Sequence, residues 1–308
     1  MSHLHKALTL YATNLKTSQM TNRPQTIQIF LPDGNPTSIK IADLTNRMIV
    51  AILIPRNKLI ESGIRDEVRK YGIYFLFGVN EDKAKPIAYI GETEDCFERL
   101  KMHNKTKDFW NYAIVITSKS NTFTKSHVKY LEHISIKTAN EVGRYDMDNQ
   151  SAPTKAYITE SMEADLLDNF ETIKILLATL GFPIFEEIRK STSKKKELLS
   201  CKGKDATAHG EMIDDGFVVL KGSIANKHET KTAGTWVTGM RTKLLDDKIL
   251  VQKDGVLIFD EDFVFNSPSA AAAAVLGRRA NGWTEWKNSE GKTIDQIYRI
   301  ETLEIIEI

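Results

Sequence analysis

Two strand patterns joined by a short polar segment constrain the fold of this chain more than any other feature. Residues 71–77 read Tyr-Gly-Ile-Tyr-Phe-Leu-Phe, and residues 87–91 read Ile-Ala-Tyr-Ile-Gly. Aromatic and β-branched side chains favour extended backbone, so the segment predicts a strand, a turn and a second strand. In such strands Tyr74 and Tyr89 can lie on one face, with their hydroxyl groups at one edge. Gly91 would let the backbone turn tightly beside a ligand, because it carries no Cβ.

The residues that follow predict two helices with polar groups suited to phosphate chemistry. Residues 91–95 predict a turn and a helix start, after which Arg99 and His103 are four residues apart and share a helical face. The planar fork of Arg contacts two phosphate oxygens at once and keeps its charge. A second helix, predicted over residues 124–137, carries Glu132. A single carboxylate is a suitable protein ligand for Mg²⁺, which usually accepts one or two and keeps its waters.

This order of two tyrosines, an Arg, a His and a later helical Glu resembles the GIY-YIG nuclease superfamily over residues 67–150. The resemblance implies a small module with a central antiparallel three-stranded sheet flanked by helices, which cuts DNA with Mg²⁺ or Mn²⁺ as cofactor. By this resemblance Tyr74 would be the general base, and Tyr89 would orient the attacking or a metal-bound water. Arg99 would neutralise the phosphate, and Glu132 would hold the metal.

Further site residues follow from the same resemblance. His103 would accept a proton or donate to the phosphate. The family also carries an Asn after the Glu helix, for which the sequence offers Asn140 and Asn149. Asn149 is favoured, because it lies in a predicted loop at a separation closer to the family's usual one. The residues expected to contact nucleic acid are Gly91, Lys101, Lys105, Lys107, Lys125, Lys129, Arg278 and Arg279. A solvated helix face is the competing interpretation for the lysines of the second helix.

A different pattern marks the C-terminal part of the chain. Ser267-Pro268-Ser269 precedes a run of alanines and predicts a capped helix that packs closely. Asn281-Gly282 predicts a turn that leads residues 283–286 into a strand. The stretch resembles an uncharacterised domain attached to bacterial GIY-YIG proteins, which implies a role in DNA targeting. Trp283 and Trp286 would stack on bases or pack in the core, and packing is favoured.

The chain as a whole is predicted to be of the α+β, or mixed α/β, class with four segments. Residues 1–68 are an N-terminal β-hairpin-containing region, with strands at 26–31, 38–41 and 46–55. Residues 69–152 are the GIY-YIG nuclease domain, and residues 153–206 are a helical segment, with a helix over 162–180, and a basic linker. Residues 207–308 are a C-terminal α+β domain, with strands near 216–221 and 255–265 and a helix over 239–250.

Composition excludes several classes of protein. The 308 residues include 42 Lys+Arg against 41 Asp+Glu, so binding to nucleic acid must depend on local cations rather than on bulk charge. Two cysteines are too few for a disulfide framework or a Cys-based zinc site, which suits a reducing cytosol. The apolar runs are too short to span a bilayer, and no secretory signal is recognisable. We therefore expect a cytoplasmic protein that binds DNA and does not bind a membrane. The sequence is compatible with a homo-oligomer.

The leading hypothesis is a metal-dependent DNA endonuclease that hydrolyses phosphodiester bonds, in restriction and defence or in DNA repair. The alternative is a non-catalytic DNA-binding or regulatory protein that retains the GIY-YIG fold. The presence of every principal residue type of the motif disfavours this alternative. A nuclease directed at RNA has no supporting motif in the sequence, and it stays open as a third hypothesis.

Overall fold

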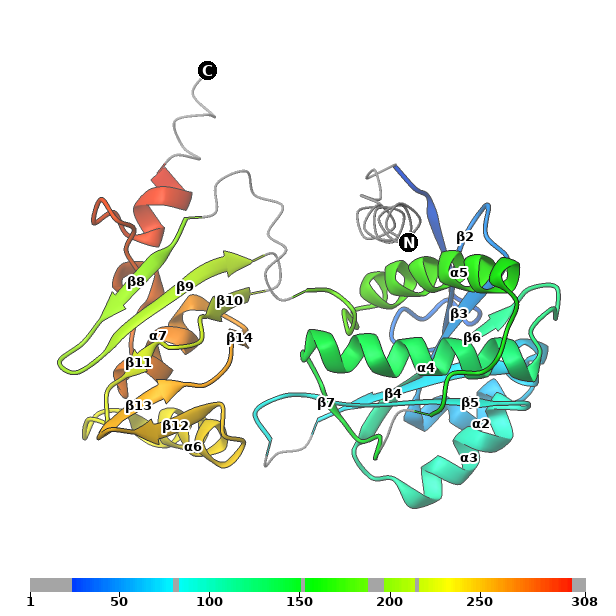
Figure 1. Cartoon of the computed structure of the whole chain (residues 1–308), viewed down its shortest axis with the longest axis horizontal. Coiled ribbons are helices and arrows are strands. Elements are labelled where there is room, and N and C mark those ends of the chain that lie inside the picture. Colours follow the sequence, from blue (N-terminus) through cyan, green and yellow to red (C-terminus); the bar gives the residue numbers. More distant parts are fainter. Residues whose placement is uncertain (1–23, 80–82, 151–152, 188–196, 214–215, 301–308) are drawn as a thin grey trace, which may run out of the picture.

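A computed structural model describes residues 24–79, 83–150, 153–187, 197–213 and 216–300 of the chain. It contains two seven-stranded sheets, each with helices packed against it, which confirms the predicted mixed α+β class (Figure 1). The first sheet is formed by strands up to residue 147, and the second by strands from residue 199 onward. No helix in these ranges is long and apolar enough to cross a membrane.

The strands of the first sheet follow the order β1-β2-β3-β6-β4-β5-β7. Their bounds are β1 (Ile27–Phe30), β2 (Lys40–Leu44), β3 (Ile49–Pro55), β4 (Gly72–Gly78), β5 (Ile87–Thr93), β6 (Trp110–Ser118) and β7 (Asp146–Met147). Neighbouring strands are antiparallel, except for the short parallel pair of β5 and β7. The N-terminal hairpin and the strand predicted at 46–55 are confirmed as β1, β2 and β3.

The sheet is wider than the three strands that the sequence predicts. The expected antiparallel set corresponds to β6, β4 and β5 in its middle, but β3 pairs with β6 along its whole length, from Ile49↔Ser118 to Pro55↔Tyr112. All seven residues of β3 are buried. An apolar strand of this kind needs cover on both faces and a partner on both edges. The sheet therefore runs across the predicted boundary between residues 68 and 69.

Helices cover the two faces of this sheet (Figure 1). α4 (Lys125–Val142) and α5 (Glu160–Thr179) pack on one face, in a core with Phe75, Phe77 and Ile90. On the other face lie α2 (Leu59–Ser62) and α3 (Cys96–Thr106), with the short 3₁₀ turns η2 (Arg56–Lys58) and η3 (Asp66–Val68) beside them. The predicted helix 162–180 is confirmed as α5, which shares its core with the sheet although the sequence assigns it to a separate segment.

The second sheet has the order β12-β13-β11-β9-β10-β14, with β8 added beside β9. Its strands are β8 (Leu199–Lys202), β9 (Thr207–Ile213), β10 (Gly216–Val219), β11 (Ile224–Ala225), β12 (Leu250–Lys253), β13 (Val256–Phe259) and β14 (Phe263–Phe265). Its helices are α6 (Gly234–Asp246), α7 (Pro268–Leu276), α8 (Gly282–Glu285) and the terminal π-helical turn η4 (Gln296–Ile300). The predicted cap at Ser267 is confirmed, since its side chain accepts the Ala270 N–H.

Two predictions in this half are wrong in detail. Asn281 caps α8 by accepting the Trp283 N–H, so residues 282–285 form a helical turn instead of entering a strand. A Cβ on Gly282 would lie 2.1 Å from the Pro268 carbonyl carbon, so this glycine permits a close approach to the start of α7. The helix predicted over 239–250 begins earlier, at Gly234. The core interpretation of Trp286 is confirmed, because its buried indole donates to the Pro268 carbonyl at 3.0 Å.

Other predicted segments lie partly or wholly outside the described residues. The weakly patterned N-terminus belongs to this group, as do residues 188–196 of the basic linker. Residues 199–202, which the sequence assigns to the linker segment, form β8 and pair with β9.

The connection between β4 and β5 contacts the second half of the chain. Asp247, at the C-terminal end of α6, accepts hydrogen bonds from the Lys83 ammonium and the Ala84 N–H, both at 2.6 Å. Lys85 forms an ion pair with Glu261, also at 2.6 Å. The segment that links the two tyrosine-bearing strands is therefore held by the second half.

Candidate active site

Tyr74 and Tyr89 lie on the same face of the first sheet. Tyr74 is paired with Gly91, and Tyr89 is paired with Leu76, so both side chains point toward α3. Their ring centroids are 6.2 Å apart. A Cβ on Gly91 would lie only 2.3 Å from the Tyr74 hydroxyl oxygen. The prediction of a tight turn at Gly91 is wrong, because this residue is buried inside β5 (Ile87–Thr93), where its missing side chain makes room for the Tyr74 ring.

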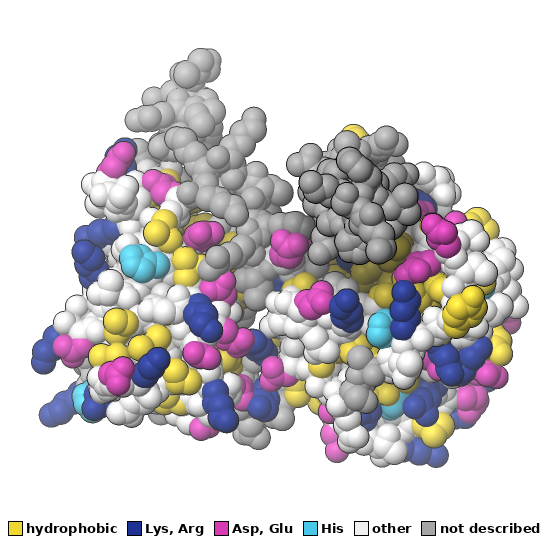
Figure 2. All heavy atoms as spheres, viewed as in Figure 1, with side chains coloured by type: hydrophobic (Ala, Val, Ile, Leu, Met, Phe, Trp, Pro, Cys, Tyr) yellow, Lys and Arg dark blue, Asp and Glu magenta, His cyan; other side chains and the backbone are white. Residues whose placement is uncertain are grey.

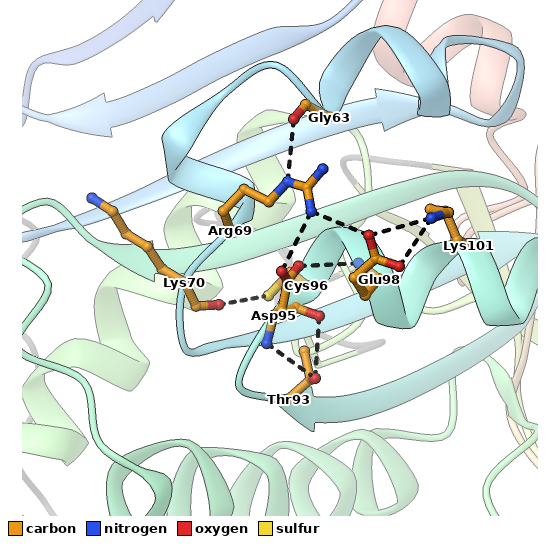
Figure 3. A network of polar contacts seen from close by, with 8 residues as sticks. All are labelled: Gly63, Arg69, Lys70, Thr93, Asp95, Cys96, Glu98 and Lys101. Carbon is orange, nitrogen blue, oxygen red and sulfur yellow. Dashed lines mark hydrogen bonds and ion pairs between the residues drawn. The ribbon is translucent and has the colours of Figure 1, made fainter.

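The first turn of α3 is fixed by the segment that precedes β4. Asp95 caps the helix by accepting the Glu98 N–H at 3.0 Å, as the charges at this helix start predict. The Arg69 guanidinium bridges the Gly63 carbonyl, Asp95 and Glu98, as Figure 3 shows. It also lies 4.2 Å from the Phe97 ring centroid. These contacts set the position of α3, which carries two of the predicted site residues.

Those two residues, Arg99 and His103, meet the hydroxyl group of Tyr74. Arg99 Nε donates to the Tyr74 oxygen at 3.2 Å, and the oxygen lies 2.8 Å from His103 Nε2. The phenol donates to Nε2 when the imidazole proton is on Nδ1, which is a buried atom without a hydrogen-bond partner among the described residues. The predicted i, i+4 pair thus clamps one hydroxyl group between a cation and a neutral imidazole.

Burial sets the protonation states of this cluster. It raises the pKa of Tyr74, an effect reinforced by Tyr89 and opposed by Arg99. Burial first, and then the charges of Arg99 and Lys107, lower the pKa of His103 to about 4. Tyr74 is therefore a protonated phenol and His103 is neutral near pH 7. The hydrogen bond with Tyr74 is the first cause of a raised pKa of Arg99.

Lys107 places a second cation beside the cluster. Its ammonium lies 4.3 Å from the Tyr89 ring centroid and forms an ion pair with Asp148. Tyr89 in turn lies 5.1 Å from His103, measured between ring centroids. The sequence placed Lys107 with Lys101 and Lys105 among the residues expected to contact nucleic acid. Lys107 differs from those two in its contact with a site tyrosine.

Asn149 and Asn140 occupy different places. Asn149 brackets Ile90 in β5, because its side chain accepts the Ile90 N–H at 3.0 Å and donates to the Ile90 carbonyl at 2.8 Å. β7 pairs only with Ile87 and Ala88. Within the described residues the edge of β5 therefore has no strand partner beyond Ile90, next to Gly91. Asn140 is exposed in the last turn of α4, away from this edge.

Glu132 lies on the other face of the sheet from Tyr74. It faces Glu92, whose main chain donates a hydrogen bond to the Glu132 carboxylate. Burial, and then the charge of Glu92, raise the pKa of Glu132 to about 7. Glu92 is itself largely buried, and its nearest cation is Lys125, at 3.0 Å. The sequence reasoning gave Glu92 no role, although strand alternation after Gly91 directs it to the face of α4.

These two carboxylates suit the metal that the resemblance implies. Mg²⁺ binds through one or two carboxylates and keeps several waters, and a cation between Glu92 and Glu132 would offset the repulsion that raises the Glu132 pKa. Searched over the described ranges, the structure contains no group of three or more His, Cys, Asp or Glu that would form an all-protein cage. The donor set therefore fits a hard, partly hydrated cation.

The remaining predicted contact residues lie around the cluster or far from it. Lys101 is paired with Glu98, and Lys105 is exposed in the last turn of α3. Lys129 is exposed on α4, near Glu132. Arg278 is paired with Glu285 in the second half of the chain. Arg279 follows α7, where its guanidinium would lie 3.2 Å from a Cβ on Gly234. The structure thus brings together Tyr74, Tyr89, Arg99, His103, Gly91 and Asn149.

Comparison with known families bears on the second half of the chain. Residues 199–298 match the model of a domain of unknown function, DUF4357. The matched segment covers the second sheet and the helices packed on it. No curated protein and no solved structure matches the chain.

The low pKa of His103 predicts a dependence of stability on pH. In the unfolded chain His103 takes up a proton near pH 6.5, whereas in the folded protein it does so near pH 4. Unfolding therefore binds a proton between these values, and stability falls as the pH falls from 6.5 to 4, by at most about 3 kcal/mol. Urea unfolding over this range should show a smaller loss for His103→Gln than for the wild type. His209→Gln serves as control and should follow the wild type; equal slopes for all three proteins would contradict the burial argument.

Proposed function

We propose that this chain is a metal-dependent DNA endonuclease of the GIY-YIG type. The observation that carries the proposal is the clamped hydroxyl of Tyr74, held by Arg99 and His103 on the face of the sheet that also carries Tyr89. A phosphate bound here would meet the partly exposed guanidinium of Arg99, since the Tyr74 phenol and the His103 imidazole are buried beneath the surface. Hydrolysis of a phosphodiester needs these functions: a proton acceptor for water and a fixed positive charge for the transition state.

The geometry supports a proton path through two residues. Tyr74 is a poor base on its own, since its pKa is raised and it is protonated at neutral pH. When the phenol oxygen takes a proton from the attacking water, its own proton passes along the 2.8 Å bond to His103 Nε2. We therefore assign the role of general base to the pair, with His103 as the acceptor; because Tyr74 is fully buried, water reaches its hydroxyl only when the residues around it move.

Substrate binding would make His103 a better acceptor. The charges of Arg99 and Lys107 both lower its pKa in the free protein. A phosphate placed beside Arg99 carries the opposite charge and would offset this part of the shift in the His103 pKa, whereas burial, which is its first cause, would remain. Arg99 would contact the phosphate directly, and Tyr89, under the Lys107 ammonium, would orient the attacking water.

Glu132, with Glu92 beside it, would hold Mg²⁺ or Mn²⁺ on the face of the sheet opposite Tyr74, so the substrate phosphate would have to lie across the edge of β5 to meet both the metal and Arg99. The metal supplies a Lewis acid that stabilises the charge developing on the leaving oxygen. Without a cation, Glu132 is about half protonated at pH 7, so metal binding releases a proton and strengthens as the pH rises through 7. Lys125 neutralises part of the charge of Glu92 and would keep that carboxylate in place.

The arrangement of the strands and helices also supports this proposal. β6, β4 and β5 form an antiparallel set with α3 on one face and α4 on the other, as the GIY-YIG arrangement requires. The division of the chain into an N-terminal region, a nuclease domain, a linker and a C-terminal targeting domain belongs to this proposal. Restriction of foreign DNA and repair of branched DNA are both compatible settings.

The test is a cleavage assay with wild type and Glu132→Ala. Supercoiled plasmid, single strands and branched DNA are incubated with each protein in Mg²⁺ or in EDTA. We expect wild type to cut at least one substrate in Mg²⁺ only, and Glu132→Ala to lose at least a hundredfold in rate. Lys137→Ala, an exposed change on the same helix, should keep the wild-type rate.

The outcomes separate the competing hypotheses. Metal-dependent cutting that persists in Glu132→Ala would remove Glu132 from the metal site. Binding of DNA without cleavage of any substrate would favour the non-catalytic alternative. The thermal midpoint gives an independent readout, since Mg²⁺ should raise it in wild type at pH 8 and leave it unchanged in Glu132→Ala.

A further inference from the structure

α6 in the second half of the chain presents a large aromatic side chain to solvent. Trp236, in the first turn of this helix, is 59% exposed. Trp110 and Trp286, by contrast, are fully buried. Exposed indoles are costly in water and are enriched where a protein binds a partner.

Packing of α6 does not explain the position of Trp236. The buried stripe of the helix consists of Val237 and Arg241, which contact α7, and Leu244, which lies in the core of the second sheet. Gly239 lies one turn after Trp236, and a Cβ placed there would have no atom within 4 Å. The side of the helix beside the indole is therefore open, and the ring has a free face for another planar group.

The surroundings of Trp236 carry an excess of positive charge. Between residues 227 and 243, Glu229 is the only acidic residue in the sequence, and its carboxylate binds the buried Arg241 at 2.7 Å. Lys227, Lys231 and Lys243 form no ion pair with any residue in the described part of the chain, although Asp246 and Asp247 follow Lys243 within one turn of the helix. Arg279 adds a fourth cation, because its guanidinium would lie 3.2 Å from a Cβ on Gly234, two residues before the indole.

The excess of positive charge around Trp236 contrasts with the mixed charges on the visible face in Figure 2. Figure 2 shows Lys and Arg side chains interspersed with Asp and Glu over the visible face of both halves. The chain as a whole has a net charge of only +1. An anionic partner would therefore gain little from bulk attraction, and would gain most where cations stand without acidic neighbours.

We propose that the surface formed by Trp236, Lys227, Lys231, Lys243 and Arg279 binds an unpaired strand of nucleic acid. A base stacks on the indole of Trp236, and the phosphates on either side of it contact the lysines and Arg279. The pairing of an aromatic platform with cations is the chemistry by which proteins hold single strands, since every base has a π-face and every linkage a charge. A duplex offers no free base face to a single indole on a convex helix.

This surface is separate from the candidate active site, and its binding does not require hydrolysis. It can be measured in EDTA, on the full chain, with mutations that leave Tyr74, Arg99 and Glu132 intact. Failure of strand binding would thus leave the cleavage proposal untouched, and failure of cleavage would leave strand binding testable.

The test is fluorescence anisotropy with three labelled probes in EDTA: a mixed-sequence DNA strand, its duplex, and an RNA strand of the same sequence. We expect wild type to bind a single strand more tightly than the duplex. Trp236→Ala should weaken strand binding about tenfold or more, and Trp236→Phe should stay within about threefold, because Phe keeps a stacking ring. Lys231→Ala should lower the salt dependence of binding by about 0.7 in the slope of log K against log salt.

Two controls match these changes. Leu245→Ala removes a partly exposed apolar side chain from the opposite side of α6. Lys292→Ala removes an exposed cation next to the β8 end of the domain, away from α6 in Figure 1. Both should bind like wild type.

Several outcomes would overturn the proposal: wild-type affinity in Trp236→Ala, equal affinity for strand and duplex, or no binding of either strand. The RNA probe distinguishes the two kinds of strand. Binding of either one that is lost in Trp236→Ala supports the surface, and the tighter of the two identifies the strand that it holds. Trp236 is exposed, so its variants should fold, and an unchanged thermal midpoint verifies this.

Discussion

Replacement of Arg99 by Ala is expected to reduce the rate of DNA cleavage by about three orders of magnitude. Arg99 is the cation that contacts the Tyr74 hydroxyl, and its fork has donors left for two phosphate oxygens. Loss of a preorganised charge at a phosphoryl transition state costs on the order of 4 kcal/mol, which corresponds to this factor. The effect should fall on kcat, since the charge is needed most when the transition state forms.

Arg99→Lys distinguishes charge from geometry. A lysine keeps the charge but cannot donate from a planar fork to Tyr74 and phosphate together, so we expect an intermediate loss of about a hundredfold. Lys105→Ala is the matched control, because it removes an exposed cation from the last turn of the same helix. It should alter KM by a small factor and leave kcat unchanged. Single-turnover kinetics on plasmid DNA measures all three variants, and an Arg99→Ala enzyme with more than a tenth of the wild-type rate would contradict the role.

The meeting of Tyr74, Arg99 and His103 could be predicted because it follows from local periodicity. Strand alternation places the two tyrosines on one face, and a four-residue spacing places Arg99 and His103 on one side of a helix. The hydroxyl that joins them was not predictable in detail. It depends on the packing of α3 against the sheet, which Arg69 fixes from the turn before β4.

Features that depend on contacts between distant segments of the chain could not be predicted from the sequence. β3 reads as a strand, but nothing in its residues shows that β6 is its partner, so the sheet is wider than expected. The position of Glu132 was predicted from its order in the motif, whereas its contact with Glu92 depends on how α4 lies across β5. Each of these requires distances between segments that are far apart along the chain.

A local sequence signal also gave a wrong prediction where the same dipeptide suits both a hairpin turn and a helix start. Asn-Gly is a strong hairpin signal, yet Asn281 is equally suited to cap a helix, and the close approach of Gly282 to Pro268 selects the helix. The exposure of Trp236 was not predictable from the helix expected over 239–250, which begins after this residue. The observed α6 begins at Gly234, and its buried stripe passes beside the indole.

Gly91→Ala is the second change with a large expected effect, although it removes no polar group. The added Cβ would lie 2.3 Å from the oxygen and 2.5 Å from Cζ of Tyr74, which is far closer than van der Waals contact allows. Gly91 does not have a positive φ, so alanine fits the backbone and the clash is the whole cost. Tyr74 is fully buried between Tyr89 and His103, with ring centroids 6.2 and 5.5 Å away, and has no free space for its ring.

We therefore expect Gly91→Ala to displace the Tyr74 hydroxyl from both Arg99 and His103. The cleavage rate should fall at least a hundredfold, and the free energy of unfolding should fall by about 1–3 kcal/mol, as in other overpacked sites. Urea unfolding and plasmid cleavage measure the two losses on the same preparation. An active Gly91→Ala enzyme would mean that the position of the Tyr74 hydroxyl does not matter to catalysis.

A double-mutant cycle separates the clash from any other effect of the new methyl group. In Tyr74→Ala the ring is absent, so adding Gly91→Ala should cost less than about 0.5 kcal/mol of stability, against 1–3 kcal/mol in the wild-type background. A coupling energy of this size is expected only if the two residues contact each other. Additive losses would instead place the damage in the strand itself, and would mean that the glycine of the second strand serves the backbone rather than the tyrosine that faces it.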